Sequence, residues 1–176
     1  MDRNYYVDMD GVLVKYDYDA YLGEEPLWLK KNSHYFRNCP PDRRMLEFVD
    51  KLHERCRYNE DELFILTSLP NKSPIFNEHF HDKIAWLHEW CPYIDIDHIL
   101  ISVSSKNDAV EYIQDHEITA NDILIDDWKE NLKEWKQKGG TAIKYCNGIN
   151  DPKSFDGIVL MHNEPVWTMF HKLDIK

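Results

Sequence analysis

The sequence lacks several features that would assign it to familiar classes of protein. None of its 176 residues lie in a run of about 18 apolar residues, so we expect no membrane-spanning segment. The N-terminus, MDRNYYVD, has no basic region followed by an apolar one, so we expect no secretory signal. The four cysteines form no C-x-x-C pair, which argues against a zinc ribbon or redox motif and favours a cytoplasmic location.

Basic residues are also scarce relative to acidic ones. The chain has 32 Asp and Glu residues against 21 Lys and Arg residues, a formal charge of −11 at pH 7. Polymeric nucleic acid is held mainly by Lys and Arg that neutralise phosphates, so we expect no binding to DNA or RNA, and no membrane partner. A small anion is not excluded, because one metal ion and one lysine can hold it locally. The sequence leaves open whether the chain is a monomer or a homodimer.

The sequence does contain a regular alternation of short apolar runs and helical patterns. The runs NYYVD, ELFILTS, HILIS, DILIDD and GTAIKYC are bounded by polar or turn residues and are too short to form helices. Two of the intervening segments have apolar residues at helical spacing: Met45, Leu46, Val49 and Leu52 in one, and Phe80, Ile84, Leu87 and Cys91 in the other. This alternation predicts an α/β fold, a three-layer Rossmann-like parallel sheet covered by helices on both faces.

Two segments fall outside the alternation. Residues 14–41 are rich in aromatic residues and end in a Pro pair, so we interpret them as a small helical cap inserted after the first strand. The predicted core then comprises residues 1–13 and 42–176. The tail from Asn150 onward is compatible with one more edge strand and a closing helix.

Polar residues follow the predicted strands where each one ends. These residues are Asp8 and Asp10, Thr67 and Ser68, Lys106 at a helix start, and Asp126 and Asp127. Because the carboxyl ends of parallel strands meet at one edge of a sheet, we expect these side chains to converge. Four carboxylates require a cation, and oxygen ligands suit Mg²⁺, which binds through carboxylates, phosphate and water. Lysine and hydroxyl groups suit phosphate oxygens, and the backbone N–H groups after Asp8 and after Ser68 can add a small anion-binding nest.

Phosphoryl transfer explains the pair of acids that closes the first strand. With metal and phosphate bound, Asp8 can attack phosphorus as a nucleophile. Asp10 lies on the same side of an extended chain and can act as general acid and then as base. Gly11 permits the turn that follows. Lys83 is a rival to Lys106 as the phosphate partner.

Four motifs in this order resemble those of the haloacid dehalogenase superfamily: DMDGVL, a strand ending in TS, a lysine at a helix start, and a strand ending in DD. Within it, the sequence is most similar to the 5′(3′)-deoxyribonucleotidases, which share the D-M-D-G-V-L opening and an L-I-D-D motif. The segment HDKIAWLHEW also resembles a helix of that family.

The resemblance implies a role for each matching residue. Asp8 matches the nucleophile and Asp10 the acid/base, while Thr67, Ser68 and Lys106 match phosphate contacts. The implied metal ligands are the side chain of Asp8, the backbone carbonyl of Asp10, and one of Asp126 and Asp127. Tyr16 matches a base-stacking Phe, and Tyr35 and Phe36 match aromatic residues of the family's cap.

These observations predict a Mg²⁺-dependent phosphomonoester hydrolase, with a (deoxy)nucleoside monophosphate as substrate and an aspartyl-phosphate intermediate. The alternatives are a phosphatase for another small metabolite, a phosphatase for nucleic-acid 3′ ends, and a non-catalytic nucleotide-binding protein. Trp86 and Trp90 are interpreted as packing residues. His79 and His81 are not expected to form a second metal site, because a His-x-His pair on a helix points to different faces.

Overall fold

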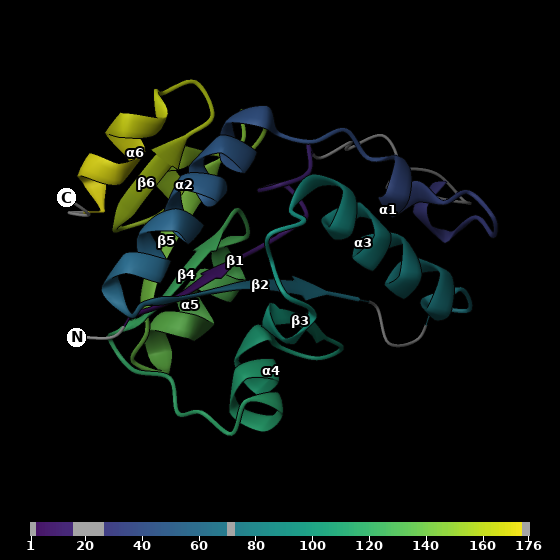
Figure 1. The fold of residues 1–176 in the computed structure, drawn as a ribbon, viewed down its shortest axis with the longest axis horizontal. Helices are drawn as coiled ribbons and strands as arrows, with labels where there is room; N and C mark the ends of the chain where they lie inside the picture. The colour runs from purple at the N-terminus through teal and green to yellow at the C-terminus, as the bar shows by residue number, and fades with distance from the viewer. Residues whose placement is uncertain (1–2, 16–26, 70–72, 174–176) are drawn as a thin grey trace.

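The structure is a computed structural model, and the residues that it describes are 3–15, 27–69 and 73–173. Its centre is one six-stranded sheet in the order β3-β2-β1-β4-β5-β6, with every neighbouring pair parallel (Figure 1). The strands are β1 (Asn4–Val7), β2 (Glu62–Ser68), β3 (Ile99–Ser102), β4 (Asp122–Asp126), β5 (Thr141–Cys146) and β6 (Ile158–Met161). The predicted Rossmann-like α/β fold is confirmed, and the C-terminal tail supplies the edge strand β6.

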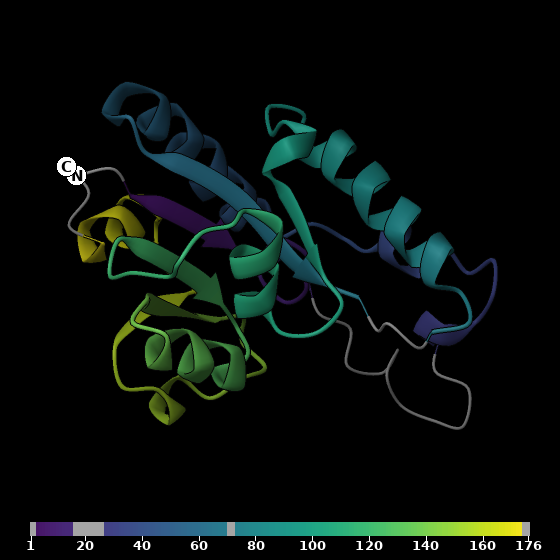
Figure 2. The same cartoon turned by 90° about the horizontal axis from the view of Figure 1, so that it is seen from below.

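Helices cover both faces of the sheet (Figure 2). One face packs against α2 (Arg43–Asn59), α3 (Phe76–Trp90) and α6 (Val166–Lys172), and the other against α4 (Lys106–Ile113) and α5 (Lys129–Gln137). The strands divide between two cores because side chains alternate along a strand. In β1, Tyr5 and Val7 join the first core and Tyr6 joins the second. None of the described helices is long and apolar enough to cross a bilayer.

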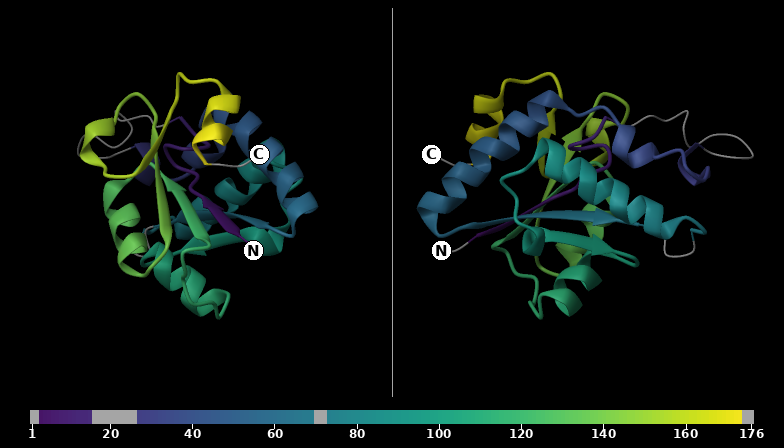
Figure 3. Two further views of the ribbon diagram at one scale, coloured as in Figure 1. Left: turned by 90° about the vertical axis from the view of Figure 1, so that its left-hand side faces the viewer. Right: turned by 45° about the vertical axis from the view of Figure 1, so that its right-hand side comes forward.

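The segment between β1 and α2 leaves the core and returns to the same place. Val14 pairs with Pro41 in an antiparallel bridge, and the backbone N–H of Lys15 donates to the carbonyl of Pro40 at 2.9 Å. The described part of this excursion contains the 3-10 helix η2 (Leu27–Leu29) and the short helix α1 (Tyr35–Asn38). The right-hand view of Figure 3 shows α1 beside α3, and the rings of Phe36 and His79 lie 5.0 Å apart. The boundaries of a separate cap, 14–41, stay a prediction.

Local side-chain caps fix the starts of two of the flanking helices, α2 and α4. The Asp42 carboxylate accepts hydrogen bonds from the N–H groups of Arg44 at 3.0 Å and Met45 at 3.2 Å, which starts α2. Ser105 and Asp108 form a reciprocal capping box at the start of α4. Lys106 is therefore held as the first residue of that helix, next to the ends of the strands. The remaining short elements are η3 (Ile96–His98) and η4 (Pro152–Ser154).

The buried face of α3 differs from the predicted one. Phe80 is 38% exposed, whereas Lys83 and Trp86 are both fully buried. The helix is rotated toward its charged side because Asp82 and Lys83 find partners in other elements, described below. Apolar spacing alone predicted a face of Phe80, Ile84, Leu87 and Cys91. Leu87 and Cys91 are buried and Ile84 is half-buried, so the prediction was wrong for Phe80.

Shortening Leu124 should test the second core. Leu124 lies on β4 and is fully buried between Tyr6, Phe64 and the helices α4 and α5. Leu124→Ala should lower the free energy of unfolding by about 2–5 kcal/mol, because a cavity replaces buried methyl groups. Urea denaturation measures this loss. Tyr112→Ala removes an 82%-exposed side chain and should change stability by less than about 0.5 kcal/mol. Equal losses in the two variants would contradict the described packing.

Candidate active site

The carboxyl ends of β1 and β4 form the centre of the site. These two strands are neighbours in the sheet, with Val7 opposite Ile125. The chain turns toward one edge of the sheet after β1 and toward the other after β4, so the crevice between their ends is the topological switch point where ligands bind in such sheets. The backbone N–H of Asp8 donates to the carbonyl of Ile125 at 2.9 Å, which sets Asp8 beside Asp126.

Lys106 lies between these two acids. Its Nζ is 2.7 Å from Oδ1 of Asp8 and 2.6 Å from Oδ2 of Asp126, and all three side chains are buried. Burial would lower the pKa of Lys106, but the carboxylates of Asp126 and Asp8 raise it above its ordinary value, so the lysine stays charged. Lys106 and Asp8 thus lie together, as the sequence predicted.

Asp126 and Asp127 have different surroundings. Both oxygens of Asp126 are occupied: Oδ1 accepts from the N–H of Trp128 at 2.7 Å, and Oδ2 accepts from Lys106 and from Asn131 at 2.9 Å. Asp127 accepts from Nδ2 of Asn147 at 3.0 Å, and no ion pair of Asp127 is found among the described residues. Asp127 is therefore the member of the pair that has more capacity for an added cation.

Gly11 makes room for Asp127. It has a φ of 79°, and a Cβ at this position would overlap the carboxylate of Asp127. Asn147 links the loop after β1 to the loop after β4, since its Nδ2 donates both to Asp127 and, at 3.1 Å, to the carbonyl of Gly11. The sequence analysis missed Asn147, although it follows β5 directly and the rule used for the other strand ends would have found it.

The acids of this site carry more negative charge than Lys106 compensates. Burial raises the pKa of Asp8 to about 7, with Asp126 and Asp10 adding to the rise and Lys106 opposing it. Burial also raises the pKa of Asp127 to about 8, with further contributions from Asp126 and Asp8. Oxygen atoms of Asp8, Asp126 and Asp127 lie within 4.8 Å of one another. A buried group of carboxylates with unneutralised charge has the donor set that a hard divalent cation requires.

Lys83 supplies a second buried cation from α3. Its Nζ contacts the carboxylate of Asp10, donates to Oγ1 of Thr67 at 2.7 Å and donates to the carbonyl of Ser68 at 3.0 Å. The ring of Phe36 lies 4.6 Å from the same nitrogen. Lys83 and Lys106 therefore contact different acids, and the sequence-based choice of Lys106 as the phosphate partner stays a prediction.

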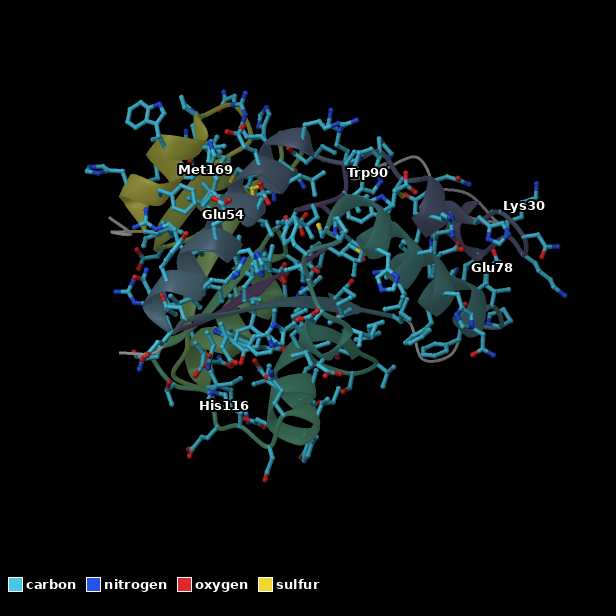
Figure 4. All side chains as sticks on the ribbon, in the orientation of Figure 1. Lys30, Glu54, Glu78, Trp90, His116 and Met169 are labelled. Atoms are coloured by element: carbon cyan, nitrogen blue, oxygen red, sulfur yellow. The ribbon has the colours of Figure 1, made fainter. Side chains whose placement is uncertain are left out.

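The excursion is fastened to the N-terminal half of α3. Glu78 and Trp90 lie at opposite ends of this helix (Figure 4). The Glu78 carboxylate accepts from the N–H of Asn32 at 2.8 Å, and His34 contacts Asp82 at 2.9 Å. His79 contacts the carbonyl of Trp28 at 2.6 Å.

Several aromatic residues considered from the sequence are packed. Tyr35 and Phe36 are 8% and 4% exposed, and their rings lie 5.1 Å apart. Their burial favours packing over contact with substrate. Trp86 is fully buried and donates to the carbonyl of Cys39 at 2.8 Å. Tyr16 lies outside the described residues.

Backbone N–H groups after Asp8 and Ser68 are less available to an anion than the sequence suggested. The N–H of Met9 donates to Oδ1 of Asp8 at 2.7 Å, and the N–H of Leu69 donates to the carbonyl of Ser102 at 2.8 Å. The expected anion nest is therefore not formed by these two groups. Any anion bound at this edge of the sheet would be contacted mainly by side chains.

A cavity of about 330 Å³ opens onto these groups. It is lined by Asp8, Asp10, Ser68, Lys106 and Asp127, together with residues that follow β4 and β5. Its volume lies within the range of small-molecule sites. A larger hollow of about 600 Å³ adjoins it, and Asn147 and Ile149 line both.

The architecture is that of haloacid dehalogenase-like hydrolases. The sequence matches no protein-family model and no curated protein. Among the solved structures that resemble it is a haloacid dehalogenase-like family hydrolase from Streptococcus pneumoniae, with a TM-score of 0.63 and 12% identity over 97% of this chain and 98% of the other. A hydrolase from Pseudomonas syringae has a TM-score of 0.62 and 12% identity over 98% of each chain. A Had-superfamily hydrolase from Ehrlichia chaffeensis has a TM-score of 0.59 and 14% identity over 99% of this chain and 98% of the other. At these identities, the likeness shows the fold.

Alanine substitutions at Gly11 and Gly139 should separate two effects: the clash of a Cβ with Asp127, which only Gly11→Ala introduces, and the strain of a positive φ, which both introduce. Gly139 also has a positive φ, 100°, but a Cβ there would meet only a carbonyl at 3.7 Å. Both alanine variants should lose about 1 kcal/mol of stability from backbone strain. Only Gly11→Ala should also weaken Mg²⁺ binding, by about tenfold or more, because it displaces Asp127. Calorimetric titration with Mg²⁺ checks this, and equal Mg²⁺ affinities in the two variants would contradict it.

Stability should depend on pH in a direction set by the raised pKa values. The ordinary pKa of an Asp carboxyl is 3.8, so between that value and about 7–8 the folded protein binds more protons than the unfolded chain. The stabilisation is complete below about pH 3.8, is lost progressively as pH rises toward the folded-state values, and is gone above about pH 7–8. In chelator, the melting temperature should therefore fall between about pH 5.5 and 8.5, at roughly 2–4 °C for each kcal/mol lost.

Added Mg²⁺ should raise the melting temperature more at the higher pH, because the carboxylates are then ionised. Asp127→Asn should show a smaller pH dependence and a smaller Mg²⁺ effect. Differential scanning calorimetry measures both quantities, and a melting temperature that rises with pH in chelator would contradict the assignment.

Proposed function

We propose that this protein is a Mg²⁺-dependent phosphomonoester hydrolase of the haloacid dehalogenase superfamily. One observation carries the proposal: Asp8, Asp126 and Asp127 lie together beside Lys106, in a cavity that also contains Asp10. Acids, a lysine and a hydroxyl around one small cavity match the needs of phosphoryl transfer, which depends on positioning and charge compensation.

The proposed metal site uses the side chains of Asp8 and Asp127 and the backbone carbonyl of Asp10. Asp126 is already hydrogen-bonded through both oxygens, so it serves to hold Lys106 and Trp128 in place. When bound, Mg²⁺ would neutralise the carboxylates and polarise a phosphoryl oxygen.

Asp8 is the proposed nucleophile. Its Oδ1 is held by Lys106 and by the N–H of Met9, both at 2.7 Å, which leaves Oδ2 to attack phosphorus. A bond forms between this oxygen and phosphorus as the bond from phosphorus to the ester oxygen breaks. Asp10 donates a proton to the departing oxygen, and the product alcohol leaves.

The second half of the reaction releases phosphate. Asp10 takes a proton from a water molecule as that water attacks the phosphorus of the aspartyl-phosphate. The bond between phosphorus and Asp8 breaks, so inorganic phosphate leaves and both carboxyl groups return to their starting states. Lys83 fixes the carboxylate of Asp10, and Ser68 and Lys106, which line the cavity, are the proposed contacts of the phosphate oxygens.

We further propose a nucleoside monophosphate as the substrate class. The similarity of the DMDGVL and ILIDD motifs to 5′(3′)-deoxyribonucleotidases supports this choice. The net charge of −11 favours a small substrate over a nucleic-acid 3′ end.

Asp8→Asn should abolish turnover. With Mg²⁺ present, the purified protein should release phosphate from p-nitrophenyl phosphate and from dUMP. The variant should be slower by more than roughly 10³-fold, because the amide cannot form the covalent intermediate. Asp50→Asn, at an exposed position on α2, is the matched control and should retain full activity. Colorimetric phosphate release measures both, and activity that survives in Asp8→Asn would refute the nucleophile.

A further inference from the structure

Two exposed apolar side chains stand beside the catalytic acids. Trp128 is 60% exposed and Ile149 is 59% exposed, and both line the cavity of about 330 Å³ that contains Asp8 and Asp10. Trp128 follows Asp127 directly, and Ile149 lies in the loop after β5. Single exposed apolar residues are common on protein surfaces, so their exposure alone means little. Their shared position at the wall of the catalytic cavity is what calls for an explanation.

The backbone of Trp128 is held in place by the catalytic network. Its N–H donates to Oδ1 of Asp126 at 2.7 Å, and the other oxygen of Asp126 binds Lys106 at 2.6 Å. Trp128 is also the residue that precedes the first turn of α5. The indole therefore projects from a backbone position that is fixed relative to the reacting carboxylates.

The loop that carries Ile149 is bonded to the same place. The N–H of Ile149 donates to Oδ1 of Asn147 at 3.1 Å, and Asn147 donates to Asp127 at 3.0 Å. Asn150 donates to the carbonyls of Asp127 at 3.1 Å and Tyr145 at 2.9 Å. Because the backbone at both residues is held by hydrogen bonds before a ligand arrives, little ordering of the backbone would oppose binding.

We propose that Trp128 and Ile149 form a subsite for a flat, unsaturated ring in the leaving group of the substrate. The proposal rests on the proposed function, because the phosphate at Asp8 places the leaving group in this cavity. Stacking on an aromatic side chain raises affinity for a base by roughly five- to 150-fold and tolerates any flat ring. A nucleobase and a simple aryl group share this chemistry. The subsite follows β4, whereas the resemblance placed base stacking at Tyr16, after β1.

Binding should reveal the subsite independently of turnover. In the Asp8→Asn background with Mg²⁺, dUMP should bind about tenfold more tightly than 2-deoxyribose 5-phosphate, which lacks only the base. Adding Trp128→Ala should remove this difference, whereas Trp128→Phe should retain most of it. Trp167→Ala is the matched control, since Trp167 is 70% exposed on α6 and is not among the residues lining the cavity. Isothermal titration calorimetry gives each dissociation constant.

The result that would overturn the proposal is equal affinity for the two ligands, or a preference for dUMP that survives Trp128→Ala. A change in sedimentation of Trp128→Ala, with unchanged ligand preference, would instead assign Trp128 to an interface and refute the subsite. Titration with p-nitrophenyl phosphate distinguishes a nucleobase from a simple aryl group. Tighter binding of p-nitrophenyl phosphate than of dUMP would identify an aryl ester as the ligand.

Kinetics distinguish failure of the subsite from failure of the proposed function. Phosphate release from dUMP and from 2-deoxyribose 5-phosphate with equal kcat/KM would uphold the hydrolase and refute the ring subsite. Binding of dUMP that depends on Trp128, without phosphate release from any ester by the unmodified protein, would uphold the subsite and refute the hydrolase.

Discussion

The site depends on one buried cation held between two strands. Asp8 and Asp126 end neighbouring strands, and Lys106 Nζ lies within 2.7 Å of both carboxylates. Burying an unpaired ion costs several kcal/mol, so neither the acids nor the lysine would be stable there without the others. The sheet order β1–β4 and the capping box at Ser105 are the structural conditions for this contact. The chemistry of the site therefore follows from how the sheet is ordered and where α4 begins.

The strands and the residues at their ends were predictable because both signals are local. Short apolar runs between helical patterns define parallel strands, and parallel strands place their carboxyl ends together. This reasoning placed Asp8, Lys106 and Asp127 at one edge without knowledge of the sheet order. The roles of the individual acids were not predictable to the same degree. Asp126 and Asp127 are adjacent and chemically identical, and only the three-dimensional environment shows that Asp126 is occupied by Lys106, Trp128 and Asn131.

Lys83 shows why the rest could not be predicted. A lysine on a helix is normally exposed, and it is buried here because Asp10 and Thr67 arrive from two other elements. The helix then rotates its charged side inward, contrary to its apolar spacing. Contacts with distant elements also determine which aromatic side chains are exposed. Phe36 is buried because α3 covers it, whereas Trp128 is exposed, and no local sequence pattern distinguishes the two. Such outcomes depend on contacts between residues that are distant in the sequence.

The antiparallel bridge between Val14 and Pro41 has a consequence for how this protein can diversify. The chain leaves the sheet and rejoins it at adjoining points, so the path of β1 into α2 does not depend on what lies between them. The segment between Val14 and Pro41 can therefore be lengthened, shortened or exchanged during evolution while Asp8 and Asp10 keep their positions. Under the proposed function, such changes in one peripheral segment would alter which substrates are accepted and leave the acids at the strand ends unchanged.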